Sequence, residues 1–500
     1  MASKREQMSN VDKAWLDMDS SVNLMIINGI MTFDDVLDFD ELKHTLETKF
    51  VARYRRFRQR VVQGTSGRVY WEDDPHFDIR AHVRRYALPE PGDKAMLQQV
   101  VSAIVNEPLD RRKPLWRYLL LENVEGGSAV LVRLHHSMAD GIALIRVLLD
   151  MTGPTAEDSL TALERPHKPH GGSHTPVGAL VGMTRSITKT GLDVARVAVS
   201  ESLQTIEHPS HLVDLARSGG IISAASTAIL AKLVLLSPDR KSAFKGELGA
   251  IKRVVWSDPV DLTRVKTLGK RYGATVNDVL VAAVAGSLRR YMIMAGDDPA
   301  LGDMNAMVPI NLRPEHRPKE DLGNEFALVY LSLPVSLADP YDRLMMTKRH
   351  MDVLKNSPEP FIGYQILGLI GVLPLDLARQ ATMWFSSKAS SVLTNVPGPR
   401  QQIYFSGKRM RNIMFWVPQS GEISLGISII SYNNGVMLGI MADEGLVTDP
   451  QALIDGFEDE LLRLEEQVRT GAENGEGPAY SEEAPVNQAL PGAKRSTPQA

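Results

Sequence analysis

Apolar positions recur in two patterns along the first part of the chain, and they predict helices that alternate with strands. Asp40–Leu46 opens a stretch in which apolar residues follow a helical period. Ala129–Leu134 is a short, mostly apolar run typical of a strand, and Ile142–Leu149 has the composition of a buried helix directly after it. This alternation is typical of an α/β protein.

A second region of the same kind begins near Lys252–Trp256, where the pattern predicts a strand followed by a helix over Val276–Met292. Three further strands are predicted, at Ala327–Leu333, Ser391–Val396 and Gly435–Met441. Asp449 and Pro450 have the order of an N-cap and a first helical residue, and we expect the helix that they open to end near Gln467.

Proline and glycine separate the two regions. Residues 153–178 contain four prolines and a Gly-Gly pair, which indicates a linker, and residues 179–240 are largely helical by pattern. From 471 onward the chain is rich in Gly, Glu, Pro, Ser and Ala, which is typical of disorder. We therefore predict an N-terminal domain over 1–170, a connector over 171–245, a C-terminal domain over 246–470 and a disordered tail over 471–500.

Composition and charge narrow the classes of protein to which the chain can belong. Its 500 residues can bury more than one core, and a net charge of −4 gives no basic field for nucleic acid. The chain has no cysteine, which excludes disulfides, thiolate metal sites and cysteine nucleophiles. The N-terminus has no apolar signal segment. The apolar stretches Ile221–Leu236 and Phe361–Phe385 are too short or too interrupted to span a membrane, so we expect a soluble or peripheral protein.

The sharpest chemical feature is the run from His135 to Gly141, which follows the predicted strand and opens the predicted helix. Strand alternation places His135 and His136 on opposite faces, so one imidazole can face a cavity while the other packs inside. A neutral imidazole can accept a proton at neutral pH. The alternatives are a satisfied core histidine and a metal ligand, although no third ligand is suitably spaced. Asp140 is expected to cap the helix or pair with an arginine, and Gly141 permits close backbone approach.

A second candidate lies at the start of the helix predicted from Val276. Thr275 and Asp278 have the spacing of a capping box, which places Asn277 in the first helical turn. Free N–H groups and a partial positive charge there can bind a phosphate or stabilise an oxyanion. A plain helix cap is the alternative.

Two aromatic or basic segments leave structural and functional interpretations open. Trp116 follows a basic run and a Pro-Leu pair, and we expect it to pack and to shape a site. The segment Arg53–Arg60 carries five arginines, which suits the phosphate groups of a ligand or a membrane surface, or else a solvated helix end running into a strand.

Taken together, these segments resemble the bacterial wax ester synthase/diacylglycerol acyltransferase family, over about residues 10 to 470. His135–Gly141 resembles the HHxxxDG motif, Pro114-Leu115-Trp116 the PLW block, and Asn277-Asp278 the ND block. Further blocks fit the family in order: Met307–Pro314, Leu322–Asn324, Asn395–Pro399 and Ser431–Gly435.

The resemblance implies two domains like chloramphenicol acetyltransferase, with a tunnel between them and a helical connector. It implies transfer of an acyl group from acyl-CoA to a lipid hydroxyl, giving triacylglycerol from diacylglycerol or a wax ester from a long-chain alcohol. His136 would be the general base, His135 and Asp140 would support it, and Asn277 would orient the carbonyl. Gly141 belongs to the same motif as these histidines. The candidates for substrate binding are Asp278, Asn395 and Trp116. Asn395 precedes a rigid turn, and that turn could equally be structural. No metal or redox cofactor is expected.

Three other functions remain open: a condensation-type or polyketide-associated enzyme that takes its acyl group from a carrier protein, a non-catalytic lipid binder of lipid droplets, and a membrane-remodelling or interaction protein, which the helical connector alone suggests. We expect a cytoplasmic location, with peripheral contact to the inner membrane face or to lipid droplets as an alternative. The sequence leaves the preferred acceptor, the acyl chain length and the oligomeric state open.

Overall fold

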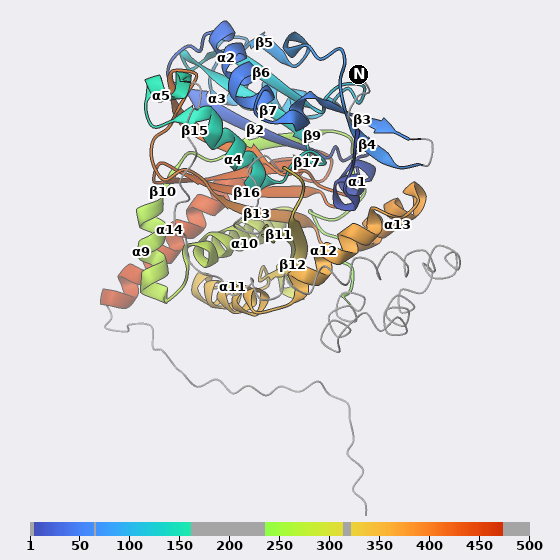
Figure 1. Ribbon diagram of the computed structural model, residues 1–500. Helices are drawn as coiled ribbons and strands as arrows, with labels where there is room; N and C mark the ends of the chain where they lie inside the picture. The colour runs from blue at the N-terminus through green and yellow to red at the C-terminus, as the bar shows by residue number, and fades with distance from the viewer. Residues whose placement is uncertain (1–4, 65–66, 162–235, 314–321, 474–500) are drawn as a thin grey trace, which may run out of the picture.

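The computed structural model describes residues 5–64, 67–161, 236–313 and 322–473, and its strands form two large sheets, one above the other in the view of Figure 1. Each sheet mixes parallel and antiparallel pairs, and helices pack around both. This mixed α/β architecture in two halves confirms the predicted fold class.

The upper sheet in Figure 1 is built mainly from the N-terminal part of the chain. Its strand order is β5 (Val83–Ala87), β6 (Trp116–Val124), β7 (Gly127–His135), β2 (Ile26–Phe33), β15 (Lys408–Trp416), β14 (Tyr404–Phe405) and β8 (Thr152–Gly153). A small separate sheet has the order β1 (Arg5–Gln7), β4 (Val69–Asp73) and β3 (Gln59–Gln63).

The lower sheet comes from the C-terminal part of the chain. Its order is β10 (Val260–Asp261), β17 (Gly435–Asp443), β16 (Leu425–Tyr432), β13 (Ser391–Pro397), β11 (Met304–Asn311) and β12 (Phe326–Leu333), and β9 (Lys252–Trp256) also pairs with β17.

Helices α1 to α5 belong to the N-terminal part, and α9 to α14 belong to the C-terminal part. The first group is α1 (Asn10–Asp17), α2 (Phe39–Thr45), α3 (Lys94–Val105), α4 (Gly141–Met151) and α5 (Ala156–Leu160), with the short helices η1 (Leu46–Val51), η2 (Arg55–Arg58) and η3 (Ile79–Ala81). The second group is α9 (Leu262–Tyr272), α10 (Val276–Met294), α11 (Pro340–Lys355), α12 (Glu359–Ile370), α13 (Leu375–Ser386) and α14 (Gln451–Glu473), with the short helix η6 (Pro299–Leu301).

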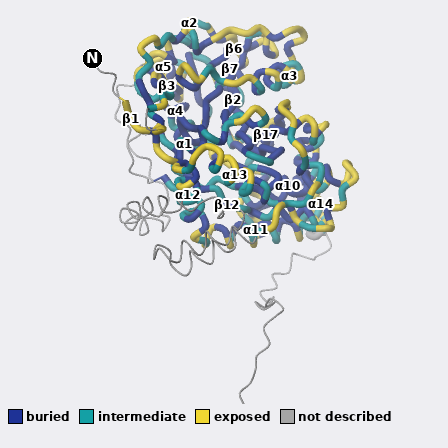
Figure 2. The backbone as a smooth tube through the Cα atoms, turned by 90° about the vertical axis from the view of Figure 1, so that its right-hand side faces the viewer, coloured by how far each residue is buried: buried dark blue, intermediate teal, exposed yellow. Residues whose placement is uncertain are grey.

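Each half has its own hydrophobic core. Helix α10 is the centre of the C-terminal core, since every residue from Asp278 to Leu288 is buried. A helix that is apolar all round must pack on all sides, and α10 contacts α9, α11 and α14 beneath the sheet (Figure 1). Figure 2 shows the same separation, with buried backbone along β2, β7 and α10 and exposed positions on the outer loops.

Strand β15 joins the two halves. It lies in the C-terminal part of the sequence but pairs antiparallel with β2, with Phe415 opposite Gly29 and Trp416 opposite Asn28. The sequential division into domains therefore does not describe this segment, because strand pairing, and not position along the chain, decides to which sheet it belongs.

Helix α1 makes a second link between the halves. Its apolar face packs on α12 and α13, so that Trp15 of α1 lies in one cluster with Phe326, Leu367 and Ile370. The N-terminal end of the chain thus contributes a side chain to the junction of the two sheets.

The individual strands and helices that the sequence predicts within the described ranges are present, with ends shifted by a few residues. Two regional predictions differ: residues 236–240, the end of the predicted helical stretch, contain no helix, and α5 lies within the predicted linker over 153–178. The helix after Pro450 begins at Gln451 and continues to Glu473, beyond the predicted end near Gln467. Most of the predicted connector and nearly all of the predicted tail lie outside the described residues.

Candidate active site

His136 follows the last residue of β7, and its backbone N–H donates to the carbonyl of Met25 at 2.7 Å. Its imidazole stacks on the indole of Trp15, with ring centroids 4.3 Å apart, and lies 5.3 Å from the ring of Phe326. Burial in this surrounding lowers the pKa of His136 to about 4. The ring is therefore neutral at neutral pH and can accept a proton.

The hydrogen bonds of Asn324 determine which ring nitrogen of His136 carries the hydrogen. Asn324 Nδ2 donates to Oδ1 of Asp12 at 2.7 Å and to the carbonyl of His136 at 2.8 Å, which fixes the orientation of the amide. Asn324 Oδ1 can only accept, and it lies 3.0 Å from Nδ1 of His136, so Nδ1 is the protonated nitrogen. Nε2 keeps its lone pair, and no hydrogen bond from the described part of the chain engages it. This is the tautomer that a general base needs.

His135 has different partners from His136, as the alternation along a strand predicts. Its Nδ1 lies 2.8 Å from Oγ of Ser137 and accepts from the Ser137 backbone N–H at 3.1 Å, so Nε2 is the protonated nitrogen. Nε2 faces Oδ2 of Asp19 at 3.7 Å, and Arg111 Nη2 donates to the same oxygen at 2.7 Å. Burial alone would raise the pKa of Asp19, but His135 and Arg111 together lower it to about 2. Nε2 makes no hydrogen bond with the described residues and is buried, so His135, with Nδ1 engaged by Ser137, does not present an accessible acceptor nitrogen.

Asp140 fulfils both of the structural roles that the sequence predicts. Its Oδ1 accepts from the backbone N–H of Ala143 at 2.8 Å and caps α4. Its Oδ2 accepts from Nη2 of Arg313 at 2.8 Å and from the backbone N–H of Glu325 at 3.0 Å. Both charged side chains of this pair are buried, so the ion pair ties the start of α4 to the C-terminal half.

Gly141 is the first residue of α4 and borders a narrow apolar cavity of about 100 Å³ between the two sheets. A Cβ atom built on Gly141 meets no other atom within 4 Å. Val396 of β13 and Ile430 of β16 line the same cavity from the other sheet. The motif therefore ends at an open apolar space.

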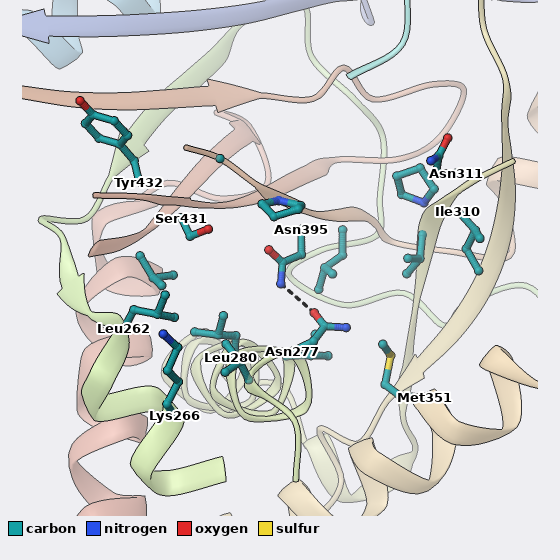
Figure 3. Close-up of a pocket in the computed structure, with 18 of the residues that line it drawn as sticks. Leu262, Lys266, Asn277, Leu280, Ile310, Asn311, Met351, Asn395, Ser431 and Tyr432 are labelled. Atoms are coloured by element: carbon teal, nitrogen blue, oxygen red, sulfur yellow. Dashed lines mark hydrogen bonds between the residues drawn. The ribbon is translucent and has the colours of Figure 1, made fainter. Parts of the chain in front are cut away.

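A larger cavity of about 830 Å³ contains Asn277 and Asn395 (Figure 3). Asn395 Nδ2 donates to Oδ1 of Asn277 at 2.8 Å, which joins the start of α10 to the end of β13. In Figure 3 this pair lies between Lys266 and Tyr432 on one side and Asn311 on the other, and the Asn277 amide nitrogen points away from Asn395. The predicted ND residue thus faces a cavity.

The other two candidates for substrate binding have structural environments. Asp278 is fully buried, and its Oδ2 accepts from the backbone N–H of Thr275 at 2.8 Å, which completes the predicted capping box. Trp116 is buried, stacks on His82 at 4.4 Å and donates from Nε1 to the carbonyl of Phe57 at 2.8 Å. Neither side chain lines the two cavities described above, so the packing interpretation describes both.

The candidate residues form two groups that one strand pair connects. His135, His136 and Asp140 belong to the buried network at the end of β7, whereas Asn277 and Asn395 face the large cavity. Asn311 lines that cavity and is the register partner of Phe326, which in turn contacts the ring of His136. The cavity therefore approaches His136 along β11 and β12.

The arginine-rich segment from Arg53 to Arg60 is engaged within the chain. Three of its guanidinium groups form ion pairs: Arg53 with Asp150, Arg55 with Asp73, and Arg56 with Glu6. These pairs favour the structural interpretation of the segment over a phosphate site.

Within the described ranges, no three His, Asp or Glu side chains come together as ligands of a metal ion would. None of the helices in the same ranges combines the length and the apolar character needed to cross a bilayer.

Sequence reasoning missed the roles of Asn324, Arg313, Trp15 and Asp12. Asn324 and Arg313 stand in two of the blocks that carry the family resemblance, which was the only signal for them in the sequence. Trp15 and Asp12 lie more than 100 residues before His136, and only the docking of α1 brings them to it.

Comparison with known protein families gives two matches that together cover most of the chain. The family model described as the wax ester synthase/diacylglycerol acyltransferase catalytic domain matches residues 8–280. The model described as the WS/DGAT C-terminal domain matches residues 322–465.

Similar proteins and similar solved structures agree with these two family matches. A protein of Mycobacterium tuberculosis named probable diacylglycerol O-acyltransferase tgs1 is 28% identical over 80% of this chain and 81% of its own length. The O-acyltransferase WSD of Acinetobacter baylyi is 26% identical over 79% of this chain and 83% of its own length.

The structure of the wax ester synthase/diacylglycerol acyltransferase from Marinobacter aquaeolei VT8 aligns with a TM-score of 0.64 and 21% identity, covering 93% of this chain and 99% of that one. The first condensation domain of the calcium-dependent antibiotic synthetase aligns with a TM-score of 0.56 and 15% identity, covering 93% and 97%. These two structures have the same fold as this chain.

Proposed function

The chain belongs to the wax ester synthase/diacylglycerol acyltransferase family and is an acyltransferase, and we propose that His136 is the general base by which it esterifies a lipid hydroxyl with an acyl group from acyl-CoA. The observation that carries the assignment is the fixed tautomer of His136. Asn324 holds the hydrogen on Nδ1 and leaves Nε2 as an acceptor. His135 cannot serve in the same way, because its Nδ1 accepts hydrogen bonds from Ser137 and its Nε2 faces Asp19.

The reaction needs little more than one placed base. A thioester carbonyl is already activated, whereas an alcohol is a poor nucleophile until its proton is removed. His136 Nε2 takes the hydroxyl proton while the oxygen bonds to the carbonyl carbon. The C–S bond then breaks, the ester leaves, and the same nitrogen returns the proton to the CoA thiolate. Atoms and charges balance without a covalent enzyme intermediate, a metal or a redox cofactor.

Asn277 is the proposed residue for orienting the acyl donor. Its Oδ1 is held by Asn395 at 2.8 Å, so the two N–H donors of its amide group have a fixed direction (Figure 3). Donors that are placed before the reaction stabilise developing charge without reorganisation. The support for this role is the position of the pair in the wall of the large cavity.

The proposed acceptors are diacylglycerol, giving triacylglycerol, and long-chain alcohols, giving wax esters. The names of the relatives support both, and the apolar cavity beside Gly141 suits a hydrocarbon chain. We place the reaction in the cytoplasm, at the surface of a membrane or lipid droplet, where such acceptors partition.

The test of donor and acceptor is a release assay with purified full-length protein. Palmitoyl-CoA is supplied with dioleoylglycerol, with hexadecanol or with no acceptor, and palmitoyl-acyl-carrier protein replaces palmitoyl-CoA in a parallel set. The proposal expects CoA release that depends on an acceptor. Release from the carrier protein alone would instead identify a condensation-type enzyme, for which the solved neighbours at present support only the fold.

A further inference from the structure

The large cavity has charges of one sign only. Three charged residues line it, Lys266, Lys355 and Arg400, and no aspartate or glutamate is among its lining residues. The chain as a whole carries a net charge of −4, so this is a local concentration of positive charge against the overall balance. A cleft lined by one sign of charge focuses the field toward ligands of the opposite sign.

Two of the three cations lie at the same end of the cavity. The backbone N–H of Asn433 donates to the carbonyl of Pro399 at 3.0 Å, which places the turn that carries Arg400 beside Asn433. The next residue, Asn434, accepts from the backbone N–H of Leu262 at 2.8 Å, and Lys266 stands one helical turn further along α9. Both charged side chains are exposed, and neither forms an ion pair with a residue of the described ranges. Lys355, by contrast, pairs with Asp352 at 3.4 Å.

Beyond this basic end the character of the cavity changes. The Asn277–Asn395 pair occupies its middle, and the wall toward Asn311 is mostly apolar, with Ile310 and Met351 (Figure 3). Lys355, one turn after Met351 on α11, is the charged residue of this wall and is paired with Asp352. Asn311 is the register partner of Phe326, whose ring lies 5.3 Å from that of His136. The order along the cavity is therefore two cations without an ion pair among the described residues, then the amide pair, then a mostly apolar wall toward the proposed base, where the cation Lys355 is paired with Asp352.

We infer that this cavity binds the donor, with Lys266 and Arg400 holding the phosphate groups of CoA and the pantetheine arm extending past Asn277 toward His136. The inference rests on the proposed function for the identity of the donor. CoA has the same order of chemistry, with anionic phosphates, then an arm with two amides, then the thioester and its hydrocarbon chain. Exposed lysine and arginine side chains can form charge-assisted bonds to phosphate oxygens.

The test compares ligands that differ only in the phosphate-bearing part. Binding of CoA and of pantetheine is measured by calorimetry on the full-length protein, and KM is measured with palmitoyl-CoA and palmitoyl-pantetheine. The double variant K266E/R400E is compared with the control double variant R68E/R84E. The control makes the same change in net charge at exposed positions of the N-terminal half, outside the cavity lining. Thermal melts establish that all variants are folded.

We expect K266E/R400E to weaken CoA binding and raise the KM for palmitoyl-CoA by about tenfold or more, because two attractive charges become repulsive. Pantetheine and palmitoyl-pantetheine should be unaffected, R68E/R84E should behave as the wild type, and the tenfold effect should shrink at high salt.

Wild-type affinity for CoA in K266E/R400E would overturn the inference, as would an equal loss for CoA and pantetheine. The two proposals fail separately. If the wild type binds CoA and the variant does not, while neither transfers acyl groups, the CoA site stands and the proposed reaction fails. If transfer is intact and KM for palmitoyl-CoA is unchanged in the variant, the reaction stands and the CoA site fails.

Discussion

Nδ1 of His136 lies 3.0 Å from Oδ1 of Asn324, a residue 188 positions further along the chain. The contact links the end of β7 in the N-terminal sheet with the residues just before β12. A second hydrogen bond joins the same two residues, from Asn324 Nδ2 to the His136 carbonyl at 2.8 Å. The protonation site of the proposed base is therefore decided by the other half of the molecule.

Replacing Asn324 should lower the rate of transfer, together with some loss of stability, because its amide also donates to the buried Asp12 carboxylate and the His136 carbonyl. In Asn324→Leu the Nδ1–H loses its acceptor, so the ring can adopt the tautomer with hydrogen on Nε2, and we expect kcat to fall by roughly tenfold or more. The measurement is kcat together with the ¹⁵N shifts of the His136 ring, which report the tautomer. A lowered kcat with an unchanged tautomer would contradict the positioning role.

The buried ring of His136 should make stability depend on pH. Its pKa falls from 6.5 to about 4 on folding, so below pH 6.5 the unfolded chain binds a proton that the folded chain does not. Stability from this group is complete above pH 6.5 and is lost as the pH falls toward 4, by roughly 3 kcal/mol in total.

The matched control for this effect is His136→Gln, which has no titrating ring. Melting temperatures from pH 7 to 4.5 should fall more steeply for the wild type than for the variant. Parallel curves would show that His136 does not have a lowered pKa. The fall of kcat/KM on the acid side should also begin only below pH 6. The reason is that His136 stays unprotonated until the pH approaches its lowered pKa of about 4.

Asp140→Ala should destabilise the protein more than removal of an ordinary helix cap. It removes the cap of α4 and also breaks the buried ion pair with Arg313, so we expect a loss of about 3–5 kcal/mol. Asp93→Ala is the control, since Asp93 caps α3 at an exposed position without an ion pair among the described residues, and about 1 kcal/mol is expected there. Urea unfolding measures both, and equal losses would show that the ion pair adds nothing.

Gly141→Ala should separate stability from activity. The added Cβ meets no atom within 4 Å, and an alanine inside a helix restricts the unfolded chain, so we expect unchanged or slightly higher stability, by about 0.4–1 kcal/mol. The methyl group would project into the narrow apolar cavity, and rates with hexadecanol as the acceptor should fall more than rates with octanol. Gly368→Ala in α12, where a Cβ also meets no atom within 4 Å, is the control and should change neither rate.

The local elements were predictable because they depend on local sequence. The apolar run that ends at His135 gives β7, and the Thr275–Asp278 spacing gives the capping box, since both follow from periodicity and hydrogen bonding within a few residues. The cap that Asp140 forms on α4 was predictable for the same reason, whereas its ion pair depends on Arg313, which lies 173 residues further along the chain and could not be identified from local sequence.

The long-range contacts were not predictable in this way. Nothing in Lys408–Trp416 indicates that it pairs with β2 and not with the strands that follow it, because its apolar half, Ile413–Trp416, fits either sheet. The stacking of Trp15 on His136 depends on where α1 docks, and the role of Asn324 depends on β12 reaching the end of β7. The family resemblance identified Asn324 as a member of one sequence block, Leu322–Asn324, but it did not identify the residues that Asn324 contacts.

The most direct test of the account is acceptor-dependent CoA release by the wild type and His136→Ala, with His135→Ala alongside and with folding checked by thermal melts. Removal of a general base lowers the rate by about 10²–10⁴. We predict a loss of this size in His136→Ala while the protein stays folded. For His135→Ala we predict a lowered melting temperature, because its contacts with Asp19 and Ser137 are lost. A folded His136→Ala variant that transfers acyl groups at the wild-type rate would contradict the assignment of the base.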